Sequence, residues 1–320
     1  SGCTTCPEPG IGRIGPIGRI RPIGPMPNPP AITTAFVDTG AVRFEVAACG
    51  DPASERLALL LHGFPESSFS WRFQLPLLAR LGYLAWAPNQ RGYGRTTRFA
   101  GADNYRLELL VDDVGRLIDA SGKKSVTLIG HDWGGIVAWM SALTAVRPLE
   151  RLVVMNLPHP TCFRRNGRTW AQFRRSWYIL FFQCPWLPEK LLAARGARAI
   201  RDAFRGMAVD KSRFPDDVLD VYARQALEPG ALTAMVNWYR AMRRMDPALQ
   251  RLIENPPILE VPTLMLWGEH DTALGKELTY GTEKLVRDFT LHYLPDVSHW
   301  VQQEAPERVN ALLEEWLLRP

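Results

Sequence analysis

The sequence contains no long apolar run. A membrane-spanning helix needs about 18 or more consecutive apolar residues, and no segment of the 320-residue chain reaches that length, so we expect no membrane span. The most apolar stretch covers residues 177–186, which is about half of what a span requires. We expect this stretch to form a buried helix instead.

Cysteine is scarce. Five cysteines, an odd number in a large chain, do not indicate a disulfide framework. Cys3 and Cys6 are spaced as C-x-x-C, but no second pair completes a zinc site. The sequence therefore predicts no metal site, and we expect no cofactor.

A strong excess of one charge is also missing. The net charge of +5 results from 38 Lys and Arg residues against 33 Asp and Glu residues, and it lacks the basic stripe typical of nucleic-acid-binding proteins. Nucleic acid is therefore not an expected partner. Five arginines form a local cluster, for which two hypotheses stay open: a solvated helix face, or a surface that meets anionic lipid or an acidic partner. The cluster consists of Arg164, Arg165, Arg168, Arg174 and Arg175.

Residues 1–30 differ in composition from the rest. They repeat Gly, Pro, Ile and Arg without a helical or strand period, which predicts an extended tail. The segment lacks the apolar core of about 7–15 residues found in a secretory signal, and we expect the protein in the cytoplasm. The oligomeric state is left open, with a homodimer among the alternatives.

Short apolar runs alternate with helical patterns over most of the remaining chain. Residues 34–49 alternate around an Asp-Thr-Gly turn, as in a hairpin. Runs typical of strands buried on both faces occupy residues 56–62, 83–89, 125–130, 151–158, 263–268 and 289–295. Helical patterns occupy residues 67–82, 105–121, 134–146, 276–287 and 306–318. This alternation predicts an α/β protein with a mostly parallel sheet flanked by helices.

The alternation is interrupted by a helical insertion. Helical patterns without an intervening strand run occupy residues 169–183, 188–206, 215–226 and 230–244. We therefore divide the globular part into a core, residues 31–158 and 258–320, and a lid, residues 159–257. Such a lid would cover the carboxyl ends of the parallel strands, where open α/β sheets bind ligands.

The strongest local motif is SVTLIGHDWGG, residues 125–135. It reads as a strand, a sharp G-x-D-x-G turn and a helix, which is the context of a nucleophile elbow. Gly130 and Gly134 suit the crowded turn because they lack a Cβ atom, and Asp132 stands at the apex. A carboxylate attacks an sp³ carbon in a strained ring or next to a leaving group, and forms an alkyl ester. The alternative is an Asp that only caps the helix.

Two further residues complete a candidate triad. Asp271 in WGEHD follows the run 263–268, and His299 in LPDVSHW follows the last core run. The order nucleophile, acid, histidine is the one expected of this elbow. His299 is the expected general base for water, while Asp271 orients the ring and stabilises its cation.

HGFPE, residues 62–66, follows the run 56–62 and predicts an oxyanion hole. The backbone amides of Phe64 and Trp133 could converge on one oxygen, and the bond before Pro65 is a candidate for the cis form. RGYG, residues 91–94, indicates a structural turn. Of the other histidines, two are expected to shape loops (His62 and His131) and three have no assigned partner (His159, His270 and His292).

Taken together, the motifs resemble the epoxide hydrolases of the α/β-hydrolase superfamily over residues 34–318. They are HGFPE (62–66), RGYGRT (91–96), GHDWGG (130–135), NLPHP (156–160), WYILFFQ (177–183), NWYR (237–240), WGEHD (267–271) and SHW (298–300). The resemblance implies the α/β-hydrolase fold. It also implies that two lid tyrosines, Tyr178 and Tyr239, donate hydrogen bonds to the epoxide oxygen. The side chains of Trp133, Phe64 and Trp300 are expected to contact substrate.

The expected function is the hydrolysis of a small apolar epoxide to a vicinal diol, with water as the second substrate. A haloalkane dehalogenase would share the triad, but these enzymes typically have Asn where this chain has Phe64, and they lack the tyrosine pair. A non-catalytic, ligand-binding member of the fold is the third alternative.

Overall fold

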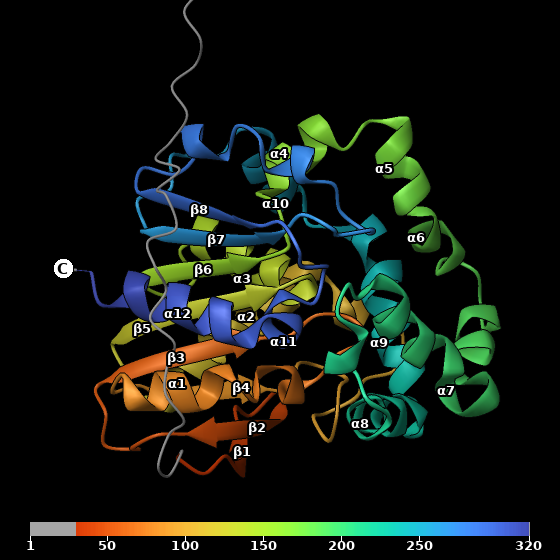
Figure 1. Cartoon of the computed structure of the whole chain (residues 1–320), viewed down its shortest axis with the longest axis horizontal. Coiled ribbons are helices and arrows are strands. Elements are labelled where there is room, and N and C mark those ends of the chain that lie inside the picture. The colour runs from red at the N-terminus through yellow and green to blue at the C-terminus, as the bar shows by residue number, and fades with distance from the viewer. Residues whose placement is uncertain (1–29, 320) are drawn as a thin grey trace, which may run out of the picture.

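The computed structural model describes residues 30–319 and is built around an eight-stranded sheet of order β1-β2-β4-β3-β5-β6-β7-β8 (Figure 1). Strands β1 and β2 pair antiparallel as the predicted hairpin, and β3 to β8 run parallel. Residues 1–29 of the predicted tail (residues 1–30) lie outside the described residues, as do Cys3 and Cys6. The strands are Thr33–Asp38 (β1), Arg43–Cys49 (β2), Arg56–Leu61 (β3), Leu84–Pro88 (β4), Ser125–His131 (β5), Arg151–Met155 (β6), Thr263–Gly268 (β7) and Phe289–Leu294 (β8).

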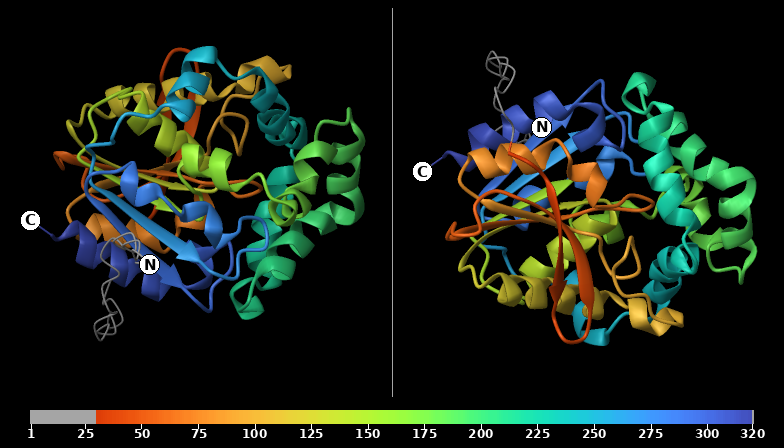
Figure 2. Two further views of the ribbon diagram at one scale, coloured as in Figure 1. Left: turned by 90° about the horizontal axis from the view of Figure 1, so that it is seen from above. Right: turned by 90° about the horizontal axis from the view of Figure 1, so that it is seen from below.

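The central strands are continuous apolar runs because helices cover both faces of the sheet (Figure 2). Successive side chains of a strand point to opposite faces. Leu57 and Leu59 pack with the helices α2 (Leu107–Ser121) and α3 (Trp133–Leu143). Ala58 and Leu60 pack on the other face with α1 (Gln74–Arg80) and α12 (Pro306–Leu317). The mostly parallel sheet flanked by helices that the sequence predicted is therefore confirmed.

One core helix was predicted wrongly. Residues 276–287 form two short 3₁₀ turns, Lys276–Thr279 and Thr282–Lys284, and not one α-helix. Gly281 between them has φ 91°, a left-handed conformation that ends a right-handed helix. The spacing that predicted a helix comes from two separate turns, of which the first buries Leu278 and Thr279 and the second buries Thr282.

The segment between β6 and β7 is helical throughout its described elements. Its helices are Pro160–Asn166 (α4), Trp170–Arg175 (α5), Trp177–Phe181 (α6), Leu187–Met207 (α7), Asp216–Leu227 (α8), Ala231–Ala241 (α9) and Pro247–Glu254 (α10). The long α7 is interrupted at residues 194–197, where three successive residues have positive φ. In Figure 1, α5 to α9 stand off one end of the sheet, whereas α4 and α10 lie beside it. The boundaries at residues 159 and 257 stay a prediction.

The apolar stretch at residues 177–186 is not the buried helix that the sequence predicted. Helix α6 contains no buried residue, and Trp177, Leu180 and Trp186 are 61%, 60% and 65% exposed. Hydrophobicity alone does not distinguish a core helix from an apolar surface, and here Trp177 and Leu180 of the short helix lie on the outer surface. Phe182, directly after it, is buried.

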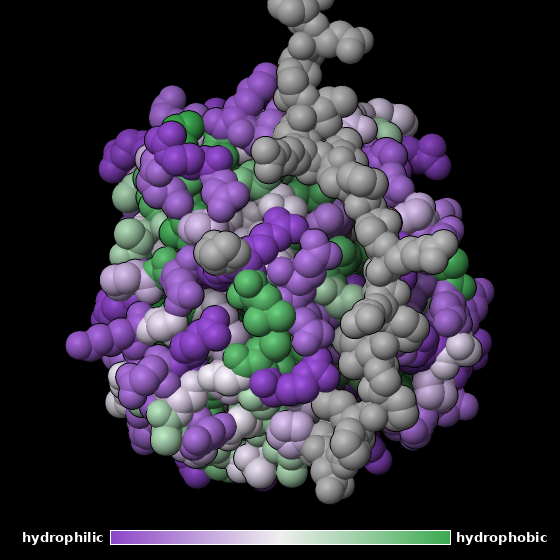
Figure 3. Space-filling model, turned by 60° about the vertical axis from the view of Figure 1, so that its left-hand side comes forward, coloured by the Kyte–Doolittle hydropathy of each residue, from purple (hydrophilic) through white to green (hydrophobic). Residues whose placement is uncertain are grey.

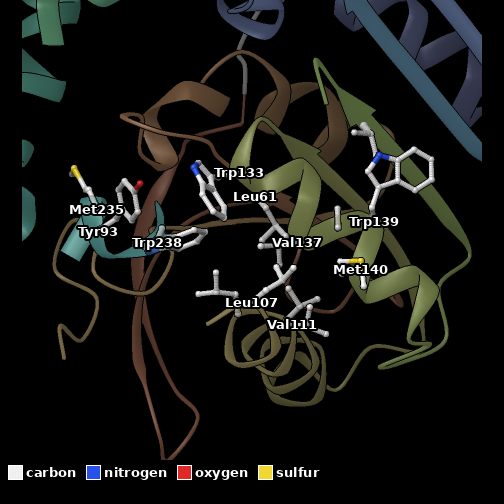
Figure 4. Close-up of a cluster of buried hydrophobic side chains, with 14 of the residues drawn as sticks. Leu61, Tyr93, Leu107, Val111, Trp133, Val137, Trp139, Met140, Met235 and Trp238 are labelled. Atoms are coloured by element: carbon white, nitrogen blue, oxygen red, sulfur yellow. The ribbon is translucent and has the colours of Figure 1, made fainter. Parts of the chain in front are cut away.

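The lid is joined to the core by aromatic side chains. Figure 4 shows Trp238 of α9 between Tyr93 and Trp133, with ring centroids 5.6 and 5.5 Å away. Below Trp133, Val137 of α3 packs with Leu61 and with residues of α2. The start of α3 is therefore held between the sheet and the lid.

The opposite side of the molecule has a different character. Figure 3, turned toward the side away from the lid, shows mostly polar residues with small, separate apolar areas.

Over residues 30–319, no helix combines the length and hydropathy that crossing a bilayer requires.

Candidate active site

The turn between β5 and α3 holds Asp132 in a strained conformation. Its φ of 49° and ψ of −121° are rare for a residue with a side chain. The turn closes tightly because glycines flank it: a Cβ atom on Gly130 would lie 2.3 Å from the carbonyl oxygen of Gly134. A Cβ atom on Gly134 would lie 2.1 Å from the carbonyl oxygen of Leu61. This backbone conformation places the side-chain carboxylate of Asp132 at the C-terminal ends of the parallel strands.

The loop after β3 lies directly against this carboxylate. The backbone N–H of Phe64 donates to Asp132 Oδ1 at 2.8 Å. Gly63 permits the approach, since a Cβ atom there would lie 2.5 Å from the Cβ atom of Asp132. The Phe64–Pro65 bond is cis, as expected. The second predicted oxyanion donor, the N–H of Trp133, belongs to the first turn of α3, where amides lack an intrahelical acceptor.

His299 lies between the two carboxylates. Its Nδ1 is 2.6 Å from Asp271 Oδ2, and its Nε2 is 3.5 Å from Asp132 Oδ2. Asp271 is fixed by two backbone amides, because Ala273 and Leu274 donate to its Oδ1 at 2.7 and 2.9 Å. The three residues follow the ends of β5, β7 and β8, as the sequence predicted for a triad.

Asn156 is a site residue that the sequence analysis did not find. Its Nδ2 donates to Asp271 Oδ2 at 2.7 Å, and its Oδ1 accepts from the N–H of Gly268 at 2.9 Å. Its φ of 42° is left-handed, which Asn tolerates better than most residues. The position directly after β6, in the motif NLPHP, was the available signal.

Opposing charges set the pKa values of the triad. Burial alone would lower the pKa of His299, but the carboxylates of Asp271 and Asp132 outweigh it and raise this pKa to about 10. Burial would raise the pKa of Asp132, but its hydrogen bond with His299 and the charge of that ring hold it below the usual value. At neutral pH the resting site therefore holds an ionised Asp132 beside an imidazolium.

A buried pair of side chains, His131 and Glu66, supports the loop of His299. His131 Nε2 lies 2.8 Å from the carbonyl oxygen of His299, and its Nδ1 lies 2.8 Å from Glu66 Oε2. Burial raises the pKa of Glu66, but His131 outweighs this and holds it below its usual value. His131 and Glu66 thus tie the loop after β3 to the loop that carries His299.

Two of the other histidines, His62 and His159, have structural contacts. His62 Nε2 accepts from the N–H of Gln90 at 3.1 Å, and burial lowers the pKa of His62 to about 4. His159 Nδ1 accepts from the N–H of Thr161 at 3.2 Å at the start of α4, and burial lowers its pKa to about 4 as well. These two neutral rings contribute to loop geometry, as expected for His62.

The turn RGYG also has structural contacts, as expected. Arg91 forms a buried, bidentate ion pair with Asp113, at 2.7 and 2.6 Å. The indole N–H of Trp238 donates to the carbonyl oxygen of Arg91 at 3.1 Å. The turn therefore links α2 in the core to α9 in the lid.

Asp132 opens into an apolar cavity of about 220 Å³ between core and lid. Trp133, Tyr178 and Tyr239 line it, while Phe64 and Trp300 are not among its lining residues. Trp300 is buried, and its ring packs against Phe204 with centroids 4.4 Å apart.

The two lid tyrosines meet in this cavity. Their ring centroids are 5.9 Å apart, and the ring of Tyr239 is 5.0 Å from that of Trp133. Burial, together with the negative charge of Asp132, raises the pKa values of Tyr178 and Tyr239. Both phenols therefore keep their protons at neutral pH and can donate them across the cavity from Asp132.

Comparison with known proteins gives consistent results. A family model described as "alpha/beta hydrolase fold" matches residues 59–306. A Bacillus subtilis protein, AB hydrolase superfamily protein YfhM, is 37% identical over 88% of this chain and 96% of its own length. Human epoxide hydrolase 4 is 35% identical over 86% of this chain and 75% of its own length. The crystal structure of Bacillus megaterium epoxide hydrolase with an inhibitor superimposes with a TM-score of 0.80 at 26% identity, over 89% of this chain and 100% of that one.

Proposed function

Because the chain belongs to the epoxide hydrolases of the α/β-hydrolase superfamily, and is thus a hydrolase acting on ether bonds, we propose that it opens apolar epoxides through a covalent ester on Asp132. The observation that carries the proposal is the cavity itself. One wall presents the ionised carboxylate of Asp132, and the lid presents two protonated phenols, Tyr178 and Tyr239.

In the first step a carboxylate oxygen of Asp132 attacks a ring carbon of the epoxide. The carbon–oxygen bond of the strained ring breaks, and its electron pair stays on the epoxide oxygen. Tyr178 or Tyr239 supplies the proton that this oxygen takes up. The product of the step is a hydroxyalkyl ester of Asp132. The step needs no base, so the protonated state of His299 does not hinder it.

In the second step water hydrolyses the ester. Esterification removes the negative charge of Asp132, which is one of the causes that raise the pKa of His299. The ring can then lose its proton to the tyrosinate through solvent and accept one from the attacking water. The N–H groups of Phe64 and Trp133 stabilise the oxyanion that forms at the ester carbonyl. Its collapse releases the diol and restores the carboxylate.

Cavity size favours a small substrate. An apolar protein cavity of about 150 Å³ can hold benzene, and the volume here is about 220 Å³. The lining includes Ile136, Leu157 and Trp238. We infer an epoxide with one aromatic ring or a short alkyl chain, held by apolar contacts.

The test offers the enzyme an aryl epoxide and a haloalkane of similar size, with product analysis for diol and for halide. We expect diol, because a departing halide would have to be solvated by donors, and the lid supplies phenols placed to give up a proton. Release of halide without formation of diol would show that the same triad catalyses dehalogenation and not epoxide opening. The absence of both products, with a panel of small apolar epoxides, would contradict the proposed function.

A further inference from the structure

The outer face of the lid combines exposed aromatic side chains with positive charge. Trp170 and Phe173 of α5 are 72% and 51% exposed, and their rings stack with centroids 5.4 Å apart. Trp177 and Leu180 of α6 are 61% and 60% exposed. We call these four residues, together with Arg165, Arg168 and Arg174, the lid patch. Large apolar side chains gathered on a surface usually mark an interaction site.

The charge of this region has one sign. Residues 160–188 contain five arginines and no Asp or Glu. Arg164 and Arg175 pair with Glu254 and Glu277, which agrees with a solvated face for these two. Arg165, Arg168 and Arg174 are exposed, and none of them forms an ion pair within the described part of the chain. Three cations are therefore available to an external anionic partner.

The lid patch also adjoins the substrate cavity. Trp170, Phe173 and Leu180 border a surface hollow of about 540 Å³. Phe163, Ser176 and Ile179 line both this hollow and the cavity of Asp132. The hollow and the cavity thus share walls. Figure 1 shows α5 and α6 on the outer side of the lid, clear of the sheet.

We propose that the lid patch docks on an anionic lipid surface, from which apolar substrates enter the cavity. Tryptophan side chains favour the interface between lipid and water, and basic residues around an apolar face are typical of peripheral lipid binding. A second copy of this chain fits less well, because the three cations would face the same three cations in a symmetric contact. The docking stands without the proposed function, whereas the entry of substrate rests on it.

The experiment measures flotation of the full chain with vesicles of phosphatidylcholine alone and of phosphatidylcholine mixed with phosphatidylglycerol. We expect binding to the mixed vesicles. Each basic residue near an anionic surface contributes about 1 kcal/mol, so the variant R165Q/R168Q/R174Q should bind on the order of a hundredfold more weakly. The variant W170S/F173S should also lose binding, because it removes the apolar contact.

A matched control removes the same charge elsewhere. Arg13, Arg19 and Arg21 precede the described residues, and R13Q/R19Q/R21Q should bind vesicles like the unmodified chain. Loss of binding in this variant but not in the lid variants would overturn the proposal. Failure of the unmodified chain to float with the mixed vesicles would also overturn it. A third contrary outcome is that the unmodified chain binds no vesicles but forms a dimer that the lid variants no longer form.

The route of the substrate is tested separately from the chemistry. The lid variants should hydrolyse a water-soluble epoxide at the unmodified rate and an epoxide dissolved in mixed vesicles more slowly. Equal loss on both substrates would overturn the entry route. A chain that floats with vesicles but hydrolyses no epoxide would contradict the proposed function and leave the docking in place.

Discussion

At the scale of single residues, the geometry separates the two halves of the reaction. His299 is positioned for water activation, whereas attack by the ionised carboxylate of Asp132 needs no base. We therefore expect H299Q to form the alkyl ester and to stall there. Mass spectrometry of the variant after exposure to an epoxide should show the substrate mass on the peptide that contains Asp132.

The control for this experiment is D132N, whose neutral amide cannot attack, so no adduct should form. If H299Q also forms no adduct, and shows no burst of epoxide loss, His299 takes part before the ester stage. The assignment of two separate roles would then be wrong.

The lid tyrosines are tested through ester formation, the first step, whereas the test of His299 concerns ester hydrolysis, the second step. Y178F and Y239F each remove one donor and keep the ring, and the remaining phenol can compensate. The double variant has no donor, and loss of such a donor in a dry site costs on the order of a hundredfold or more in rate. Rapid-quench measurement should show slow ester formation and an unchanged hydrolysis step. An unchanged rate of ester formation in the double variant would show that both tyrosines only pack in the lid. Dehalogenation would then become the better-supported function.

Among the residues of the site, sequence reasoning found those with a local signal. Asp132 lies in a motif that specifies its own turn, because Gly130 and Gly134 have to be glycine for the turn to close. Asn156 lies in the motif NLPHP, but that motif does not identify the partner of its side chain. Its function depends on Asp271, which is distant in sequence and comes near only when β6 and β7 pair. A side chain whose partner is defined by tertiary structure cannot be assigned from spacing alone.

At the scale of elements, strands with a local sequence signal were predicted correctly, whereas two helical segments whose structure depends on their surroundings were not. The central strands are buried on both faces, so their sequences are unbroken apolar runs that can be recognised without the fold. Helix α6 is apolar, yet it contains no buried residue and exposes Trp177 and Leu180, so the rule that apolar segments are buried fails for it. The segment at residues 276–287 fails for another reason: the left-handed Gly281 divides a continuous pattern into two turns.

The packing of α3 against β3 leads to a prediction for this element. A Cβ atom on Gly134 would meet backbone, which cannot move aside as a flexible side chain can. We expect G134A to lower the free energy of unfolding by about 1–3 kcal/mol and to reduce turnover, because the start of α3 also carries Asp132. Urea unfolding and a diol assay measure the two effects.

Gly206 in α7 provides the matched control, since an added Cβ atom there meets no atom within 4 Å. Because alanine favours a helix more than glycine does, G206A should be neutral or stabilising by up to about 1 kcal/mol. A stability for G134A equal to that of G206A would show that the elbow tolerates a side chain, contrary to the close contact between α3 and β3.

At the scale of the whole molecule, the triad couples protonation to stability. His299 has a pKa of about 10 in the folded protein and a usual value of about 6.5 when unfolded. A raised pKa stabilises the folded state fully below the unfolded value, and this contribution disappears as pH rises through the folded value. The difference in unfolding free energy between the unmodified protein and H299Q should therefore shrink between about pH 6.5 and 10. A difference that stays constant over this range would contradict the charged resting state.

The order of the triad along the chain has a consequence for biosynthesis. Asp132 leaves the ribosome long before His299, and at roughly 5–20 residues per second the interval is on the order of ten to thirty seconds. During that time the carboxylate has neither its imidazolium partner nor the strands β7 and β8 that position the acid and the base. An unfinished chain therefore cannot complete a catalytic cycle, and the site becomes functional only after β8 has joined the edge of the sheet.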